Sequence, residues 1–538
     1  MTPLESRARR QLLQLIGASA ATWSLPRSAW SQSRLNQNPF TLGVASGSPT
    51  PDSVVLWTRL HAAKSSPWGG SDALGQAAVP VRWELAHDEQ FSRIVQSGQS
   101  LAVPELAHSV HVEVAGLDAD RWYFYRFLAG DFVSPVGRTR TLPKPDAVVA
   151  RLRLAYASCQ KWEDGYFSAW RHMREENLDL VLFLGDYIYE YPALISKVRV
   201  PTGGWVLSLD DYRQRYALYK GEADLQAMHA ACPWLITWDD HEVQNDYAGL
   251  QAGYSSALDP SKPENFLARR AAAYQAWYEH MPVRASALTQ GLAGLASGAE
   301  LRIYSRLPYG QLASIYLLDG RQYKDPQACT PGGGVGSGKV KPDTCPQWNA
   351  AARSLLGRAQ EHWLYDEFSK PGSKESGWNV LGQPTLFGQR DLQAGPGQTF
   401  WNDGWDGYPA ARTRLTDALR QHAVANPVIL GGDLHENWVG HVKADYANPG
   451  SASVGVEFCG TSISSRSGGN AKTAQRLAEN PHFVFAEAQR KGYGVAEFTK
   501  AQLTTTLRVV DDVTRQDTKI ETLARFTVQA GRAVVEQT

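Results

Sequence analysis

The chain has 538 residues, of which 43% are hydrophobic and 20% charged, and it contains 54 basic and 54 acidic residues. This composition excludes a disordered or collagen-like chain, and the length indicates more than one domain. Because the formal net charge is zero, bulk electrostatic attraction to nucleic acid or to an anionic membrane is excluded, and any anion must be bound locally.

Residues 1–34 have the features of an export signal. The pair Arg9 and Arg10 precedes a modest apolar run over residues 12–23. We predict a twin-arginine signal peptide, so that this segment engages the twin-arginine export machinery and the mature protein is periplasmic or extracellular. The alternative is an amphipathic basic helix. The apolar run is too short for a good membrane span, and hydropathy predicts no integral membrane segment later in the chain.

Residues 38–145 are predicted to form an all-β domain. Short segments such as SVVLWTRL and HSVHVEVAGL alternate polar and apolar side chains with turn residues between them, which indicates a small antiparallel sandwich. The stretch from Leu117 to Tyr125 resembles the late strands of a fibronectin type III domain. The Pro-rich segment 141–147 then predicts a linker into a larger domain over residues 150–538.

In this larger domain, apolar strands alternate with helical segments. Candidate helices cover residues 166–177, 209–231, 265–281 and 357–370. Apolar runs of the VLF, LIT and VIL type between amphipathic helices predict an α/β domain with a largely buried central sheet. After residue 480 the sequence predicts a hairpin that completes the sheet system.

Residues 180–189, LVLFLGDYIY, are the most informative segment of this domain. An apolar run ends at a glycine, after which Asp186 and, three residues later, Tyr189 are expected at the carboxyl end of a buried parallel strand. Open α/β sheets place their ligands at this end, and hard or highly charged metal ions prefer oxygen donors. An equally simple alternative is a turn in which Asp186 caps the following helix.

Four more apolar runs end in chemically active residues, which favours the metal interpretation. These runs and the residues at their ends are 151–159 with Cys159, 234–241 with Asp239, Asp240 and His241, 314–323 with Asp319 and Arg321, and 427–435 with Asp433 and His435. If all five strand ends face one edge of one sheet, their side chains converge. The sequence therefore predicts a metal site at that edge.

The five cysteines are of three kinds. Cys329 and Cys345 bracket a Gly-rich loop, and we predict that they form a disulfide in an oxidising compartment. Cys232 and Cys459 lie in apolar segments and are expected to be small buried hydrophobes. The alternative for Cys159 is a further buried thiol, but its position among the other strand ends favours a metal ligand.

Taken together, these motifs resemble those of PhoD-type alkaline phosphatases, within the calcineurin-like metallophosphoesterase superfamily. The segments that carry the resemblance are ASCQ at 157–160, FLGDYIYE at 183–190, TWDDHEVQNDYAG at 237–249, LDGRQYKD at 318–325 and GGDLHENW at 431–438. The resemblance covers nearly the whole chain and implies an N-terminal fibronectin III-like β-sandwich followed by an αββα-type metallophosphoesterase sandwich. It also implies a secreted, metal-dependent alkaline phosphatase or phosphodiesterase that hydrolyses small phosphate esters through a metal-bound water or hydroxide.

The same resemblance implies iron and calcium as cofactors. Cys159 stands where the superfamily has Asp-x-His, and Cys159 and Tyr189 would bind Fe³⁺, because thiolate and phenolate ligands favour trivalent iron over zinc. Asp186 would bridge two metals. At position 433 an Asp replaces the superfamily's His, so a carboxylate oxygen replaces an imidazole nitrogen, and the second site then favours Ca²⁺, which prefers oxygen ligands. The remaining implied ligands are Asp240, Asn245 and His435.

Two residues have implied roles in catalysis. The resemblance places His241 where it protonates or hydrogen-bonds the scissile ester oxygen. Arg321 would hold a phosphate through two hydrogen bonds, with pairing to a neighbouring carboxylate as the alternative. His482 is a weaker candidate, better explained as a structural core histidine.

Two other function classes make different predictions. A zinc hydrolase of another substrate, such as an amide, would be colourless and rich in histidine ligands, whereas histidine is scarce at these strand ends. A secreted binding protein that kept calcium but lost catalysis would lack His241 or a metal ligand, and none is missing. Hydrolysis of phosphate esters is therefore the preferred prediction, and the preference between monoesters and diesters stays open.

Overall fold

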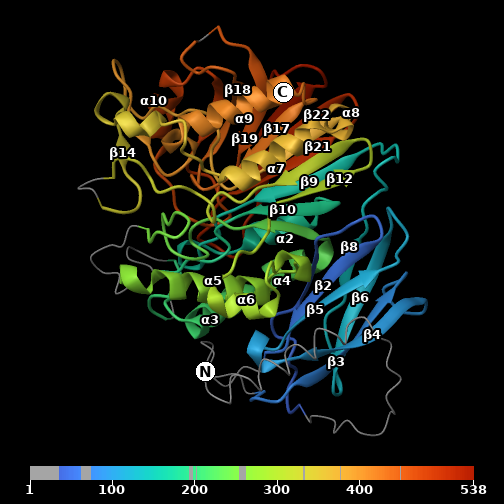
Figure 1. Cartoon of the computed structure of the whole chain (residues 1–538). Helices are drawn as coiled ribbons and strands as arrows, with labels where there is room; N and C mark the ends of the chain where they lie inside the picture. Colours follow the sequence, from blue (N-terminus) through green and yellow to red (C-terminus); the bar gives the residue numbers. More distant parts are fainter. Residues whose placement is uncertain are drawn as a thin grey trace.

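The computed structural model describes residues 35–61, 74–192, 198–200, 203–253, 262–330, 334–375, 377–448 and 450–538. The predicted signal peptide, residues 1–34, lies outside these ranges. The chain forms a mixed α/β structure with several sheets, and Figure 1 shows its early strands at one end and its C-terminal elements at the other. Within the described ranges, no helix is long and apolar enough to cross a membrane.

Two large sheets form the centre of the molecule. The first has ten strands, in the spatial order β24 (Glu536–Gln537), β23 (Ile520–Gln529), β22 (Gln502–Val510), β21 (Gly492–Phe498), β9 (Leu152–Ala157), β10 (Leu180–Leu184), β11 (Trp234–Thr237), β1 (Val44–Gly47), β2 (Ser53–Arg59) and β5 (Ser109–Ala115). The second has seven, in the order β12 (Ser305–Tyr309), β13 (Ala313–Leu317), β15 (Trp378–Gly382), β17 (Pro427–Gly431), β19 (Ser453–Cys459), β18 (Asn437–Lys443) and β20 (Phe483–Glu487).

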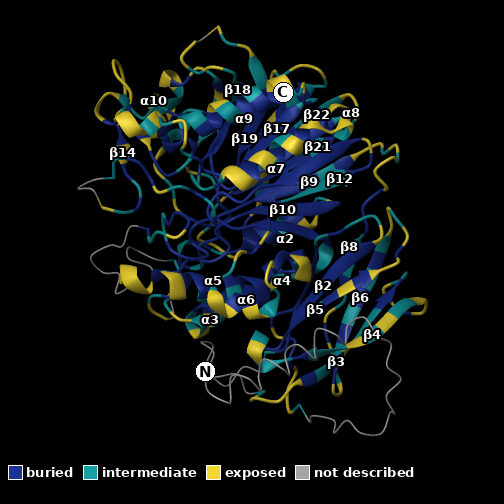
Figure 2. Cartoon of the chain, in the orientation of Figure 1, coloured by how far each residue is buried: buried dark blue, intermediate teal, exposed yellow. Residues whose placement is uncertain are grey.

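Alternate residues of β10 explain why its sequence is continuously apolar. Leu182 packs in a cluster that also holds Ile315 and Val428 of the second sheet, whereas Val181 and Phe183 pack in a cluster with the helices on the other side. Successive side chains of a strand point to opposite faces, so a strand covered on both faces needs apolar residues at every position. Figure 2 shows the central strands buried along their length.

Helices cover the outer face of each large sheet. On the first sheet these are α2 (Ser168–Arg174), α3 (Leu209–Lys220), α4 (Ala223–Ala231) and α5 (Phe266–His280). On the second they are α7 (Arg358–Ser369) and α9 (Pro409–Gln421). The layers therefore follow the order helices, sheet, sheet, helices.

Most predicted elements are confirmed, with one correction. The segment 209–231, predicted as one helix, divides at Gly221 into α3 and α4. The predicted hairpin near the C-terminus is formed by β21 and β22. Further helices and strands outside the N-terminal region are α6 (Leu292–Ser297), α8 (Pro371–Glu375), α10 (Asn470–Glu479), β14 (Lys339–Val340) and β16 (Phe400–Trp401).

The N-terminal strands are divided between two sheets. A five-stranded sheet contains β3 (Val79–Ala86), β4 (Ile94–Ala102), β6 (Trp122–Ala129), β7 (Phe132–Val133) and β8 (Gly137–Arg140), and one apolar cluster joins it to β1, β2 and β5. These last three strands extend the ten-stranded sheet through a parallel contact between Gly47 and Trp234. A Cβ atom at Gly47 would lie 2.7 Å from the carbonyl oxygen of Trp234, so only glycine allows this approach. The sequence does not predict this continuity.

The five predicted strand ends belong to two sheets, so the expectation of one sheet edge is wrong. β9, β10 and β11 lie in the first sheet, and β13 and β17 lie in the second. A buried parallel strand has the same apolar pattern in either sheet, and the sequence alone does not separate them. Because the two sheets pack face to face, their strand ends can still converge.

The cysteines comprise one disulfide pair and three unpaired thiols. Cys329 and Cys345 form a disulfide, which closes the loop that contains β14. Cys159, Cys232 and Cys459 are unpaired and buried.

Candidate metal centre

The ends of three site-bearing strands, β9, β10 and β17, share an unusual backbone conformation. Cys159, Asp186, Asp433 and His435 have φ angles of 59°, 57°, 67° and 58°. Non-glycine residues rarely adopt positive φ, and such conformations persist where the surrounding structure holds them, often at functional sites. The chain therefore turns sharply at each of these candidate ligands.

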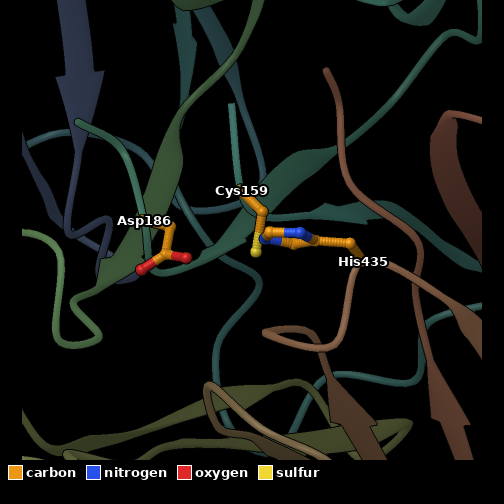
Figure 3. A group of neighbouring side chains, drawn as sticks. All are labelled: Cys159, Asp186 and His435. Carbon is orange, nitrogen blue, oxygen red and sulfur yellow. The ribbon is translucent and has the colours of Figure 1, made fainter. Parts of the chain in front are cut away.

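The first group of candidate ligands joins both large sheets. Cys159, Asp186 and His435 lie with their side chains close together (Figure 3), and one donor atom of each lies within 4.8 Å of the others. The Tyr189 hydroxyl donates to Asp186 Oδ2 at 2.9 Å and lies 3.0 Å from His435 Nε2. His435 Nδ1 contacts the carbonyl oxygen of Arg466, which assigns the ring proton to Nδ1 and leaves a lone pair on Nε2. One phenol hydrogen cannot satisfy both acceptors.

The second group shares a carboxylate with the first. Asp186, Asp240 and His241 each offer a donor atom within 4.8 Å of the other two. His241 Nδ1 lies 2.8 Å from Glu190 Oε2, and the other oxygen of Glu190 accepts the backbone N–H of Asn245 at 2.7 Å. Burial lowers the pKa of His241, but Asp240, Asp186 and Glu190 outweigh burial and raise that pKa well above its usual value.

Two buried carboxylate oxygens beside these groups lack a hydrogen-bond partner within the described ranges, namely Asp186 Oδ1 and Asp239 Oδ2. An ionised oxygen buried without a partner is costly. Burial, together with Asp240, raises the pKa of Asp186 well above its usual value although His241 acts in the opposite direction. A bound cation would supply the missing partner, so the donor set fits metal binding.

Glu242 holds together two of the strand ends. Its Oε2 accepts the backbone N–H groups of Asp186 and Asp239, at 3.1 and 2.8 Å, and its Oε1 accepts that of Tyr187 at 2.5 Å. The buried carboxylate therefore fixes the backbone at both candidate ligand positions. Glu242 lies in the motif at 237–249, but its spacing in the sequence predicts no role for it.

Arg321 lies among carboxylates. It is 2% exposed. Its Nε donates to Asp239, its Nη1 donates to Asp403 at 3.0 Å, and its Nη2 lies 3.5 Å from Asp240. This arrangement favours the carboxylate-pairing alternative over a hold on a substrate phosphate.

A third acidic group is already balanced by basic side chains. Asp240, Asp246 and Asp403 offer oxygens within 4.8 Å of one another, but Asp403 also pairs with Arg321 and with Lys324 Nζ at 2.5 Å. Burial raises the pKa of Asp403, but Arg321 and Lys324 outweigh burial and hold it below its usual value. We interpret this group as an ion-pair network beside the candidate metal centre, built partly from Asp246 and Asp403, whose sequence contexts predict no role for them.

Apart from Tyr189, whose hydroxyl contacts the first group, Asp433 and Asn245 are the implied ligands that stand outside all three groups. Asp433 Oδ2 accepts the Thr385 hydroxyl at 2.7 Å, and burial, together with Asp240, raises the pKa of Asp433 to about 6. The Asn245 amide donates to Asp246 Oδ2 at 2.7 Å. Their assignment as ligands therefore rests on the resemblance. His482 is likewise outside the groups, and its Nε2 contacts the carbonyl oxygen of Gln389.

Replacement of Arg321 with methionine is expected to lower the free energy of unfolding of the metal-stripped protein by about 3–5 kcal/mol, because Asp239 and Asp403 lose a buried partner. The shift of the midpoint of urea unfolding measures the loss in free energy of unfolding. The matched control is Arg121→Met, which removes an exposed pair with Asp118 and is expected to cost at most about 1 kcal/mol. Equal losses in the two variants would contradict the interpretation of Arg321 as a structural ion pair.

Comparisons with known proteins identify the family. A family model for PhoD-like phosphatases matches residues 154–507, and a model for the N-terminal domain of PhoD-like phosphatases matches residues 26–143. The chain belongs to the PhoD-like phosphatase family.

Two relatives of this PhoD-like phosphatase match it over most of its length. Alkaline phosphatase D of Bacillus subtilis (strain 168) is 44% identical over 501 residues, which cover 91% of this chain and 81% of the relative. The solved structure of PhoD superposes with a TM-score of 0.84 at 41% sequence identity, over 94% of this chain and 93% of that structure. The resemblance inferred from the motifs of this PhoD-like phosphatase is therefore confirmed.

Proposed function

We propose that this PhoD-like phosphatase is an exported, metal-dependent alkaline phosphatase, active also on phosphodiesters, that hydrolyses small phosphate esters. The observation that carries the proposal is Asp186, which belongs to both metal-binding groups, so that two cations would share one carboxylate. Adjacent cations suit phosphoryl transfer, in which charge develops on several oxygens at once. The name of the Bacillus subtilis relative, alkaline phosphatase D, supports the same reaction.

The proposed cofactors are Fe³⁺ in the first group and Ca²⁺ at the two carboxylates of the second group, with His241 left unligated for proton transfer. Cys159 and Tyr189 supply a thiolate and a phenolate, which favour trivalent iron, whereas the carboxylate of Asp240 suits calcium. Asp186 is the shared ligand. Asn245, Asp433 and His435 complete the proposed set. When bound, the cations would neutralise the phosphoryl oxygens and lower the pKa of the attacking water.

His241 is the proposed acid for the leaving oxygen. Because Glu190 occupies Nδ1, Nε2 is the nitrogen that remains available to give a proton to an ester oxygen. Ser465 supports the neighbouring ligands, since its hydroxyl contacts the Tyr189 hydroxyl at 2.9 Å and the carbonyl oxygen of Cys159 at 2.8 Å. These contacts hold the phenol and the thiol-bearing backbone in place.

The proposed organisation has three parts. They are a twin-arginine signal peptide over residues 1–34, a fibronectin III-like sandwich over 38–145 and an αββα-type metallophosphoesterase domain over 150–538. The apolar cluster between the N-terminal sheets and the layer order around the two large sheets support the second and third parts.

Protein produced through its native export route is expected to contain iron and to absorb visible light, with a violet to reddish colour from tyrosinate bound to ferric iron. Tyr189→Phe is expected to remove the colour and the phosphatase activity together, because the ring stays and the phenolate is lost. Elemental analysis, visible spectra and turnover of a phosphate ester measure the effect. Tyr187→Phe is the matched control, since the Tyr187 hydroxyl contacts His229 instead of the site. A fully active wild type without iron would refute the iron assignment.

A further inference from the structure

A line of aromatic rings leads outward from His241. The ring of Tyr189, on the inner side, is buried and lies 4.2 Å from the ring of His241 between centroids. Tyr191 lies 5.2 Å from the same histidine, edge-on, and is partly exposed. Beyond it the ring of Trp205, also partly exposed, lies 6.1 Å from Tyr191. Aromatic surface thus continues from the proposed acid to the solvent.

Trp205 differs from the tryptophans of the core. Trp238 and Trp277 are fully buried against other rings. Within the described ranges, Trp205 has one ring contact, a tilted one with Tyr191 at an interplanar angle of 44°. An aromatic ring that keeps solvent-facing surface beside a site offers a platform on which a planar ligand can stack.

The two rings are held in position before any ligand arrives. Nη1 of Arg215 donates to the carbonyl oxygens of Tyr189 and Tyr191, and Nη2 donates to that of Gly204 at 3.0 Å, which fixes the backbone next to both rings. Lys161 Nζ lies 3.9 Å from the centre of the Tyr191 ring. Rings that are already immobilised lose little conformational freedom when a ligand binds.

We propose that Tyr191 and Trp205 form the leaving-group subsite and that it selects phosphate esters whose leaving group carries a planar aromatic ring. The inference rests on the proposed function, in which His241 faces the ester oxygen. The group attached to that oxygen departs past His241, and the rings that border this histidine toward the solvent are Tyr191 and then Trp205. A planar ring gains a stacking contact there that a saturated ring of the same size lacks.

Benzyl phosphate and cyclohexylmethyl phosphate test the subsite, because both are esters of primary alcohols and differ mainly in the planarity of the ring. Wild-type kcat/KM is expected to favour the benzyl ester by about three- to tenfold. Trp205→Leu and Tyr191→Leu are expected to bring this ratio close to one, whereas Tyr191→Phe keeps it because the ring remains. Trp363→Leu is the matched control, since Trp363 is also partly exposed but packs on Tyr304, away from His241.

The outcomes separate the subsite from the reaction itself. A wild-type ratio near one would overturn the subsite while leaving the phosphatase reaction intact. A Trp205→Leu variant whose kcat/KM falls by the same factor on both esters would also overturn the subsite, because it would show a general effect on folding or access. A wild type that hydrolyses neither ester would overturn the proposed function and the subsite with it.

Discussion

Replacement of Asp186 with asparagine is expected to abolish turnover and, in the same protein, to stabilise the metal-free fold. The variant removes a donor from both metal-binding groups at once. Loss of a residue that only supports a ligand typically costs 10- to 100-fold in metal affinity or activity, so loss of the shared ligand is expected to cost more than about 100-fold in kcat. Iron and calcium contents are expected to fall together.

The gain in stability follows from the surroundings of the same carboxylate. Asp186 is buried, its Oδ1 has no partner within the described ranges, and burial together with Asp240 raises its pKa despite His241. A neutral amide of the same shape relieves this cost by roughly 1 kcal/mol or more. Asparagine also tolerates the positive φ of 57° at this position, so the backbone turn is retained.

Thermal unfolding of the metal-stripped proteins, together with elemental analysis and kcat, tests both halves of this expectation. The matched control is Asp319→Asn, because Asp319 is equally buried but accepts hydrogen bonds from Arg321, Gln322 and Trp238. The control is expected to lower the unfolding midpoint, whereas Asp186→Asn raises it. If both variants are destabilised alike, the unpartnered oxygen is not evidence for a cation site.

Replacement of Glu190 with glutamine is expected to slow esters with poor leaving groups much more than esters with good ones. Glu190 accepts the hydrogen bond at Nδ1 of His241 and thereby orients the ring of the proposed acid. General acid catalysis contributes about 10²- to 10⁴-fold, and only when the leaving group needs a proton. For an alkyl phosphate, His241→Gln is therefore expected to lose that factor and Glu190→Gln about 10- to 100-fold.

Measurement of kcat for p-nitrophenyl phosphate and for an alkyl phosphate separates this role from a structural one. Both variants are expected to lose less than about tenfold on the aryl ester, whose leaving group departs without a proton. The double variant is expected to match His241→Gln, since the two residues act as a unit. Glu242→Gln is the comparison, because Glu242 holds backbone N–H groups and its loss is expected to affect both esters equally. Equal losses in Glu190→Gln would remove Glu190 from the proton-transfer step.

The sequence predicts the strands of the site well and their arrangement less well. The run LVLFL predicts β10 because a strand covered on both faces has no polar position. The assignment of β13 and β17 to a second sheet depends on contacts between distant segments, and these leave no local pattern. The pairing of β1 with β11 cannot be predicted from the sequence for the same reason, since it depends on a single close approach at Gly47.

The residues of the candidate site are likewise partly predictable from the sequence, whereas the pairings between them are not. Cys159, Asp186 and His435 could be predicted because each lies within four residues of the end of an apolar strand. The pairing of Glu190 with His241 could not, because it joins residues 51 positions apart and depends on how two loops meet. The same holds for Asp403, which arrives from a loop 82 positions beyond Arg321 and supplies much of the charge balance. Side chains that act through a partner carry no spacing signal of their own.

The position of β9 in its sheet has a consequence for the order of events during synthesis. β9 precedes Cys159 directly and lies between β10 and β21, so residues 152–157 pair on one side with residues 492–498. A nascent chain therefore carries β9 with one edge open until almost all of the polypeptide has left the ribosome. Closing so long a loop is slow, and the unpaired edge favours wrong partners meanwhile. It follows that the Cys159 side of the candidate site is assembled only after residues 492–498 have been synthesised, and that any metal bound there would enter after that step.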